Sequence, residues 1–523
     1  MRVLLVTPPY SLEEHPMPPL SLSYLAGVLL AQGVEVEILD LLTSKASAAK
    51  VRRKLAQYQP HVVGTTCVTM TFPAAARILK VCKQFDPAIT TIIGGPHVTF
   101  AAEDTFHRAP WIDVIVAGEG DHTIGEIISA IDRQADLQDI PGIFLHRNGK
   151  VAKTAPRPLI ENLDELPFPA RHLLPLSRYK ALGASCSIIS SRGCPYGCIY
   201  CSAPKMFGRK VRFRQPRQVV DEIEFIHRGL GFARVNIVDD TFTLNHRHTE
   251  ELCHEILRRN LGIEWNAYSR VDTLNREMLE LMREAGCTFL VFGIESGDQD
   301  ILNTIKKGIT PEKVRNAVKL TSEAGIKSFA SFILGLPGES PEAARTSLAL
   351  AREVFEGYGV QYGFHFLSPF PGTEVYEEAE KFGIRLTTRD WARYSANEPI
   401  TRSSSDGLAT AKKIKADYDR DIDLAWGKMR EMAEEGDEFC AEALRNRQTG
   451  EFVWKLLRGD LIESLGRIRG TTTPQQALEG LAQALSARTG TALEIASHEI
   501  GQLSQKGLLQ PRASNGTVVW HWA

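Results

Sequence analysis

Three of the nine cysteines lie within eight residues of one another, in the stretch SRGCPYGCIYC. They are Cys194, Cys198 and Cys201. Thiolates are the usual protein ligands of iron–sulfur clusters. Glycine or proline at 193, 195 and 197 lets the loop curl tightly enough for three thiolates to converge. Three protein ligands on a four-iron cluster leave one iron open, and an open iron can chelate a small molecule through an amine and a carboxylate.

Zinc is the alternative for these cysteines. A zinc site usually combines one C-x-x-C pair with a second pair of Cys or His ligands. The pair Cys198 and Cys201 has no evident second pair, because Cys186 falls in an expected strand while Cys253 and Cys287 stand alone. An odd number of cysteines in so long a chain also argues against a disulfide framework. The spacing therefore favours an iron–sulfur cluster.

The cysteine loop directly follows the first of six strand–helix units that we expect over residues 186–395. The expected strands are 186–191, 234–239, 263–269, 288–294, 328–334 and 360–366. Helical patterns such as 218–230 and 311–325 separate them. Six units suggest a partial (β/α)6 version of the eight-unit barrel, whose chemistry takes place at the carboxyl ends of its strands.

Residues 186–373 resemble the radical S-adenosylmethionine superfamily, through the cysteine motif and its position after the first strand. The resemblance implies that the three cysteines bind three irons of a four-iron, four-sulfur (4Fe-4S) cluster. The fourth iron then chelates the methionine end of S-adenosylmethionine, and Tyr200 lies against the adenine. Reduction of the cluster by an external electron donor cleaves the carbon–sulfur bond and gives a 5′-deoxyadenosyl radical.

Polar residues at the other strand ends fit a pocket for S-adenosylmethionine. They are Asp239, Asp240, Arg270, Glu295 and Ser296. The family contacts the substrate's amino group after the second strand, where the two aspartates stand. An arginine can pair with the carboxylate, and a glutamate between glycines can reach ribose hydroxyls. The alternatives are acids that cap helices and an ion pair between Arg270 and Asp272. The Gly- and Pro-rich stretches 335–339 and 369–373 are either pocket walls or turns.

Residues 1–145 alternate strands with amphipathic helices, which predicts an α/β domain with a doubly wound, Rossmann-like parallel sheet. In such sheets ligands bind beyond the carboxyl ends of the strands. The candidate residues there are Pro8, Thr65, Thr66, Gly94, Gly95, His97, Gly118, Glu119 and Gly120. Small residues let a large, flat ligand approach the backbone. No G-x-G-x-x-G follows the first strand, so a dinucleotide is disfavoured.

The order of TPPY, PPLSLSYLAGVL, IIGGPH and VAGEGD before the cysteine loop resembles the cobalamin-binding branch of the same superfamily. This implies a methyltransferase acting on unactivated carbon or phosphorus, or a ring-forming enzyme or oxidoreductase without net methylation. One S-adenosylmethionine would methylate cobalamin, and a second would supply the radical. The Asp-x-His-x-x-Gly motif of many other cobalamin proteins is absent from residues 1–150. We therefore expect His97 to contact the corrin or to cap a helix, rather than to bind cobalt.

The remaining segments carry no evident catalytic group. Residues 146–185 are rich in proline and suggest a linker draped over the surface. Residues 396–523 suggest a mainly helical C-terminal domain, with a long helix at 411–436 and a small helical unit that closes with a strand. We expect a lid, substrate contacts or a partner-binding surface there.

Composition excludes several classes of function. The net charge of −2 gives no field that favours nucleic acid or acidic membranes. No apolar run is long enough to span a membrane, and the N-terminus lacks the features of a signal peptide. We expect a cytoplasmic enzyme with a small-molecule, peptide or protein substrate. Two non-enzymatic or cobalamin-free alternatives stay open: a sensor with a relict cluster, and an N-terminal docking module.

Overall fold

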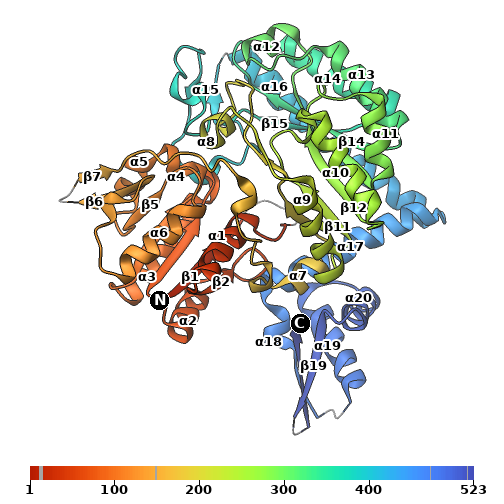
Figure 1. Ribbon diagram of the computed structural model, residues 1–523. Helices are drawn as coiled ribbons and strands as arrows, with labels where there is room; N and C mark the ends of the chain where they lie inside the picture. Colours follow the sequence, from red (N-terminus) through yellow and green to blue (C-terminus); the bar gives the residue numbers. More distant parts are fainter. Residues whose placement is uncertain (11–15, 148–149, 404, 471–472, 515) are drawn as a thin grey trace.

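Figure 1 presents the computed structural model, in which a sheet domain at the N-terminus lies beside a larger barrel-like domain, with a smaller C-terminal unit below. The structure describes residues 1–10, 16–147, 150–403, 405–470, 473–514 and 516–523. Strands and helices alternate along most of the chain, which confirms the predicted α/β class.

The N-terminal sheet has seven strands in the order β2-β1-β3-β4-β5-β6-β7. Its parallel part is β1 (Arg2–Thr7), β2 (Glu35–Asp40), β3 (Val62–Thr66), β4 (Thr90–Gly94) and β5 (Val114–Val116). Helices α1 (Leu20–Ala31) and α6 (Asp121–Asp132) cover one face, and α2 (Ala48–Tyr58) and α3 (Phe72–Phe85) cover the other. Successive residues of β1 alternate between the two cores, as a doubly wound sheet requires.

An antiparallel hairpin, β6 (Ile143–Arg147) and β7 (Lys150–Lys153), extends this sheet beyond β5. The prediction that a linker begins at residue 146 is therefore wrong for its first residues. Edge strands exposed on one face carry alternate polar residues, and the short sequence KVAK gave no apolar run that would predict a strand.

Much of residues 154–168 is exposed at the surface, as predicted for the linker, whereas the later part of the expected linker, from residue 169, is wedged between the two domains. It forms the short helix α7 (Leu176–Ala181), and both Arg171 and Tyr179 are buried. Tyr179 donates a 2.5 Å hydrogen bond to Asp40 of the N-terminal sheet. Arg171 binds Glu222 of the barrel at 2.6 Å. Proline-rich composition predicted the lack of long elements but gave no information on burial.

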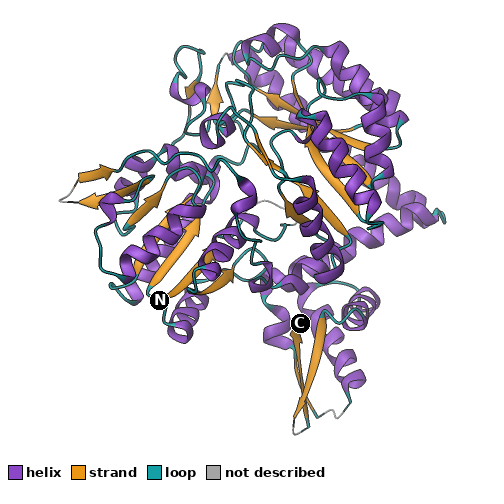
Figure 2. Ribbon diagram, in the orientation of Figure 1, coloured by secondary structure: helices purple, strands orange, loops and turns teal. Residues whose placement is uncertain are grey.

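The second sheet has six parallel strands in the order β15-β14-β13-β12-β11-β8 and is open between its two edges, as predicted for a partial barrel. The strands are β8 (Cys186–Ile188), β11 (Arg234–Ile237), β12 (Glu264–Ser269), β13 (Cys287–Glu295), β14 (Lys327–Leu334) and β15 (Gln361–Phe366). The helices α9 (Pro216–Glu224), α10 (His246–Arg258), α11 (Arg276–Glu284), α13 (Pro311–Glu323) and α14 (Pro341–Tyr358) connect them. Figure 2 shows these helices on the side of the sheet that faces away from the N-terminal domain.

The C-terminal region is mainly helical, as predicted, with α16 (Ser405–Glu434), α17 (Glu438–Gly459), α18 (Leu461–Leu465), α19 (Pro474–Thr489) and α20 (Leu493–Gln505). It closes with three antiparallel strands rather than one: β18 (Arg467–Arg469), β19 (Leu509–Ser514) and β20 (Thr517–Trp522). The resulting unit has the topology of a winged helix and its own small core. Among the described residues, no helix is both long and apolar enough to cross a membrane.

Candidate active site

The base of the cysteine loop is tied to the end of β11 by Asp239. This fully buried carboxylate accepts hydrogen bonds from the backbone N–H of Ser190 (2.7 Å), the hydroxyl of Ser190 (2.5 Å) and the hydroxyl of Ser191 (2.7 Å). Burial raises the pKa of Asp239, although these hydrogen bonds oppose the shift. Asp239 was expected to contact S-adenosylmethionine; its bonds instead position the loop that carries the cysteines.

The loop itself curls at Gly193, whose φ of +112° suits glycine. A Cβ at this position would lie 2.8 Å from the Lys210 carbonyl oxygen. The three cysteines of the loop are free and partly exposed. Within the described ranges, no three His, Cys, Asp or Glu side chains converge on one metal ion. A cubane cluster does not require three side chains around one metal ion, because each thiolate binds a different iron.

Burial raises the pKa of the Cys201 thiol to about 12 and raises that of Cys194 as well. Both thiols are therefore protonated at neutral pH unless iron displaces the proton, as is usual for metal ligands. The donor set, three thiols on one glycine-rich loop, fits an iron–sulfur cluster.

A triad of the buried Glu295 and Lys307 with the partly buried Tyr200 lies next to the loop, at the end of β13. The Tyr200 hydroxyl lies 3.0 Å from Oε1 of Glu295, and Lys307 Nζ lies 2.9 Å from the same oxygen and 3.2 Å from the Tyr200 hydroxyl. Glu295 has a φ of +70°, which is uncommon outside glycine. The structure thus brings Tyr200 and Glu295 together, as expected for one pocket. Sequence reasoning missed Lys307, a lone charge with no motif around it.

Arg270 and Ser296 are held by other protein groups. Arg270 makes two hydrogen bonds to Asp272 (2.9 and 3.0 Å), which is the ion pair that the sequence offered as the alternative. Its guanidinium also lies 3.6 Å from the centre of the Tyr196 ring. The hydroxyl of Ser296 lies 3.1 Å from that of Ser347. Arg270 still lies beside the cysteine loop, through Tyr196.

A cavity of about 510 Å³ lies between the two sheets. Of the predicted residues, it is lined by Pro8, Thr65, Thr66, Gly94, Gly95, Gly118, Glu119, Gly120 and Asp240. Ser191 and Arg192, at the base of the cysteine loop, line it as well. Burial raises the pKa of Asp240, which borders the same loop, to about 6. The carboxyl ends of both sheets therefore open into one cavity.

Glycines line part of the N-terminal side of this cavity, among them Gly94, Gly95, Gly118 and Gly120. Gly95 has a φ of +104°, and a Cβ there would lie 2.4 Å from the Cys67 carbonyl oxygen. Gly118 has a φ of +71°, and no atom of a described residue lies within 4 Å of the place where its Cβ would be. Glycines at this edge let a large, flat ring such as a corrin approach the backbone.

His97 does not line the cavity. Its ring packs at 4.7 Å from Phe72 and 5.1 Å from Trp391, and neither ring nitrogen has a hydrogen-bond partner among the residues that the structure describes. Burial lowers its pKa to about 4, so the imidazole is neutral at physiological pH. The expectation that it contacts the corrin does not match this position, which lies under the segment that follows the barrel.

Two family models match the chain: a B12 binding domain over residues 14–128 and the radical SAM superfamily over residues 188–351. The chain is 35% identical to an uncharacterized methyltransferase of Pyrococcus horikoshii over 408 residues, which are 77% of this chain and 88% of that protein. The chain belongs to the cobalamin-binding radical S-adenosylmethionine enzymes.

This radical S-adenosylmethionine enzyme has further relatives in sequence and structure. It is 32% identical to the anaerobic magnesium-protoporphyrin IX monomethyl ester cyclase of Rubrivivax gelatinosus, over 77% of the chain and 74% of the cyclase. It shares its fold with the methyltransferase TsrM of Kitasatospora setae (TM-score 0.64, 23% identity, 74% of this chain and 79% of that one). The cobalamin-dependent radical enzyme OxsB has the same fold as well (TM-score 0.70, 17% identity, 97% of this chain and 79% of that one). The predicted cofactors, a 4Fe-4S cluster, S-adenosylmethionine and cobalamin, are those of this family.

Proposed function

We propose that this enzyme is a methyltransferase that moves a methyl group from cobalamin to an unactivated carbon or phosphorus atom of its substrate. The observation that carries the proposal is one cavity bordered both by the glycine-rich edge of the N-terminal sheet and by Ser191 and Arg192 at the base of the cysteine loop. Relatives named as methyltransferases support it, among them the cytidylyl-2-hydroxyethylphosphonate methyltransferase of Streptomyces wedmorensis (28% identity over 73% of this chain and 82% of that protein).

In this proposal each part of the site has one task. Cys194, Cys198 and Cys201 hold the cluster, and Tyr200 with Glu295 and Lys307 orients the adenosine. Asp240 accepts a hydrogen bond from the amino group of S-adenosylmethionine. The backbone at Thr65, Thr66, Gly94, Gly95, Gly118 and Gly120 holds the corrin. When bound, the cluster supplies the electron that cleaves S-adenosylmethionine to a radical, and cobalamin supplies the methyl group.

The apolar lining of the cavity serves to exclude water, which would quench a reactive radical. Buried residues such as Leu5 and Ile92 contribute to that lining. We further propose a small-molecule substrate, an external electron donor and a cytoplasmic location, with no role for nucleic acid, since the net charge is only −2.

A second candidate function is ring formation without net methylation, with the same cofactors. The similarity to the magnesium-protoporphyrin ester cyclase over three quarters of both chains favours it. The mass of the product separates the two: methylation adds one methylene group per turnover, and ring formation adds none.

The test is anaerobic reconstitution with iron, sulfide, S-adenosylmethionine, methylcobalamin and a strong reductant, followed by mass spectrometry. We expect 5′-deoxyadenosine from the wild type and none from Cys198→Ala, because loss of one thiolate disrupts the cluster. The variant should still bind cobalamin, since Cys198 lies outside the N-terminal domain. Cys440→Ala, in the C-terminal helix α17, is the matched control and should behave as the wild type. A cofactor-loaded wild type that makes no 5′-deoxyadenosine would refute the proposal.

A further inference from the structure

A network of four charged side chains joins the N-terminal domain to the cysteine loop. Glu119 and Asp121 stand where β5 leads into α6, and Arg192 and Arg212 come from the barrel side. Arg192 makes two hydrogen bonds to Asp121, at 2.8 and 3.2 Å, and a third to Glu119 at 3.2 Å. Arg212 binds the other oxygen of Glu119 at 2.9 Å. We call these four residues the ionic clamp.

The clamp is buried and balanced in charge. The side chains of Arg192, Glu119, Asp121 and Arg212 are 11%, 2%, 7% and 5% exposed. Two carboxylates face two guanidinium groups, so no charge is left over. A buried ion pair contributes little net stability compared with apolar packing, because desolvation offsets the attraction. What such a network supplies is fixed geometry, since Arg192 binds Asp121 through both terminal nitrogens and this bidentate contact accepts few orientations.

The clamp also holds the surrounding backbone. Arg192 and Arg212 face each other across the two-stranded ribbon of β9 (Ser191–Arg192) and β10 (Arg212–Phe213). Arg212 donates to the carbonyl oxygens of Ile160 (2.6 Å) and Phe207 (2.8 Å), and the N–H of Ile160 donates to Glu119 at 2.8 Å. Three segments far apart in sequence therefore meet at one point.

Both ends of the clamp border the cavity. Arg192 stands two residues before Cys194, and Glu119 stands between Gly118 and Gly120 at the edge of the N-terminal sheet. Arg192, Glu119 and Asp121 are all among the residues that line the cavity. Any change in the length of the clamp therefore changes the distance between the cysteine loop and the glycine edge.

We propose that the ionic clamp is a positioning device that sets the spacing between the two halves of the site. The assignment of the halves to a cluster and to cobalamin rests on the proposed function. Glu119, Asp121, Arg192 and Arg212 act through the backbone that they hold, so they are positioning residues. A weakened clamp leaves each half intact but lets the two halves shift relative to each other. A reaction within one half then continues, whereas a transfer across the cavity slows, since a misplacement of about 1 Å can cost roughly a hundredfold in rate.

The test compares Asp121→Asn and Arg212→Lys with the wild type. Asparagine keeps the shape of aspartate, and lysine keeps the charge of arginine but loses its fork. The control is Glu353→Gln, which breaks the exposed pair Arg315–Glu353 (2.6 Å; side chains 41% and 49% exposed). The first readout needs no cofactor: hydrogen exchange of residues 189–201 and 117–121 in the full chain. We expect faster exchange in both clamp variants and no change in Glu353→Gln.

The second readout uses protein loaded with all three cofactors. We expect 5′-deoxyadenosine formation within about twofold of the wild type, because that reaction needs the cysteine side alone. S-adenosylhomocysteine, formed when a methyl group crosses to reduced cobalamin, should fall about tenfold or more, by the same positional argument. Iron content and bound cobalamin should be unchanged.

Two results would overturn the clamp. The first is that both variants show the same hydrogen exchange and the same ratio of the two products as the wild type. The other is loss of iron or cobalamin together with an equal fall in both products, which would make the network a general folding element. A wild type that makes neither product would refute the proposed function instead, and the hydrogen exchange of the variants would still decide on the clamp.

Discussion

Lys307 illustrates how one residue controls the chemistry of a buried group. Its ammonium neutralises Glu295 next to the Tyr200 hydroxyl, and the side chains of Lys307 and Glu295 are only 7% and 9% exposed. An unpaired carboxylate in such a place is strongly disfavoured by desolvation. Burial, and then the neighbouring Glu295, raise the pKa of Tyr200 well above its ordinary value, so the tyrosine stays a neutral hydrogen-bond donor.

We expect Lys307→Met to lower the free energy of unfolding by about 3–5 kcal/mol, because it leaves Glu295 buried without a cation. The double variant Lys307→Met with Glu295→Gln should recover most of that loss, since no charge is then buried. Urea unfolding of all three proteins measures the effect. Equilibrium dialysis of cluster-loaded protein should find weaker binding of S-adenosylmethionine in both variants. Equal stabilities of the single and double variants would contradict this account.

A site residue could be predicted from the sequence where a local motif identifies it. The cysteines stand close together in the chain, so their spacing alone indicates a cluster. No such local signal marks Lys307, Arg192 and Arg212, whose partners are distant in sequence or carry no motif. In the sequence they cannot be distinguished from isolated cations on a surface. The acids at strand ends were identified as site residues, but the sequence could not say that Asp239 would bind serines or that Glu119 would bind arginines.

At the scale of elements, both parallel sheets could be predicted because buried parallel strands are continuous apolar runs. The hairpin β6–β7 and two of the three strands of the C-terminal unit were missed, since short antiparallel strands alternate polar and apolar residues over few positions. Parallel strands of the N-terminal sheet lead into glycines, and the site depends on the backbone conformation of these glycines. Gly95, between β4 and the short helix α4 (Pro96–Phe100), is the tightest of these near the cavity.

We expect Gly95→Ala to displace the end of β3 or the start of α4. The new Cβ would lie 2.4 Å from the Cys67 carbonyl and 2.8 Å from the Thr66 hydroxyl, both at the edge of the cavity. Gly33→Ala is the control, because Gly33 also has a positive φ (+74°) but no atom within 4 Å of its Cβ position. The free energy of unfolding of the control should fall by about 1–2 kcal/mol from backbone strain alone. Gly95→Ala should lose more and should take up less cobalamin, as measured by thermal unfolding and by absorbance after gel filtration. Equal cobalamin uptake by both variants would argue against the glycine edge as its binding surface.

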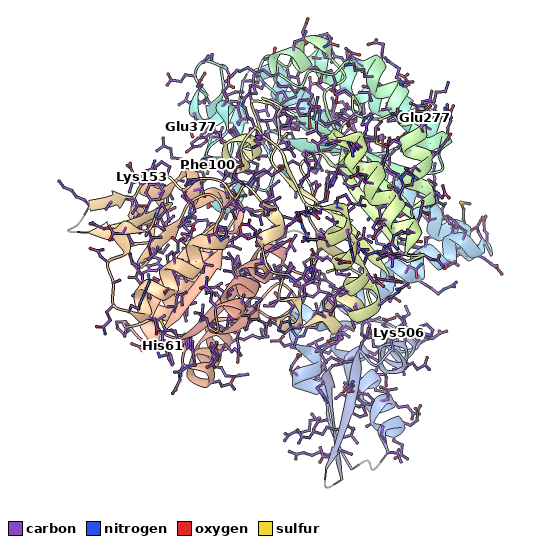
Figure 3. The ribbon with its side chains drawn as sticks, viewed as in Figure 1. His61, Phe100, Lys153, Glu277, Glu377 and Lys506 are labelled. Carbon is purple, nitrogen blue, oxygen red and sulfur yellow. The ribbon has the colours of Figure 1, made fainter. Side chains whose placement is uncertain are left out.

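At the scale of the whole molecule, the N-terminal domain is fastened to the barrel at several places around the cavity. The ionic clamp lies on one side, and the hydrogen bond from Tyr179 to Asp40 lies on another. A third contact is made after the barrel: Trp391 donates to Asp104 at 2.9 Å and packs against His97. Nearby, Gly372 approaches Phe100 and donates to Glu377, and Figure 3 shows Phe100 and Glu377 close together where the two domains meet. The spacing of the two half-sites is therefore a property of the assembled chain.

The contact at His97 makes this junction sensitive to acid. The pKa of His97 is lowered from its ordinary 6.5 to about 4, mainly by burial; Asp104 opposes the shift and Arg108 adds to it. Between these two pH values the unfolded chain binds a proton that the folded chain does not. The stability of the folded chain therefore falls as the pH drops from about 6.5 toward about 4, by about 1.4 kcal/mol per pH unit. Above pH 6.5 the group has no effect.

We expect His97→Phe to remove this slope while keeping an aromatic ring against Phe72 and Trp391. Urea unfolding at pH 5.0 and 7.5 gives the free energy of unfolding of both proteins. The difference between the variant and the wild type should be about 2 kcal/mol more favourable to the variant at pH 5.0 than at pH 7.5. His254→Gln, at an exposed position on α10, should keep the slope of the wild type. Hydrogen exchange of residues 387–402 at pH 5.0 locates the effect: it should be faster in the wild type than in His97→Phe, since protonation loosens the segment that holds the two domains together. Parallel pH profiles for His97→Phe and the wild type would mean that another group governs the response of this junction to acid.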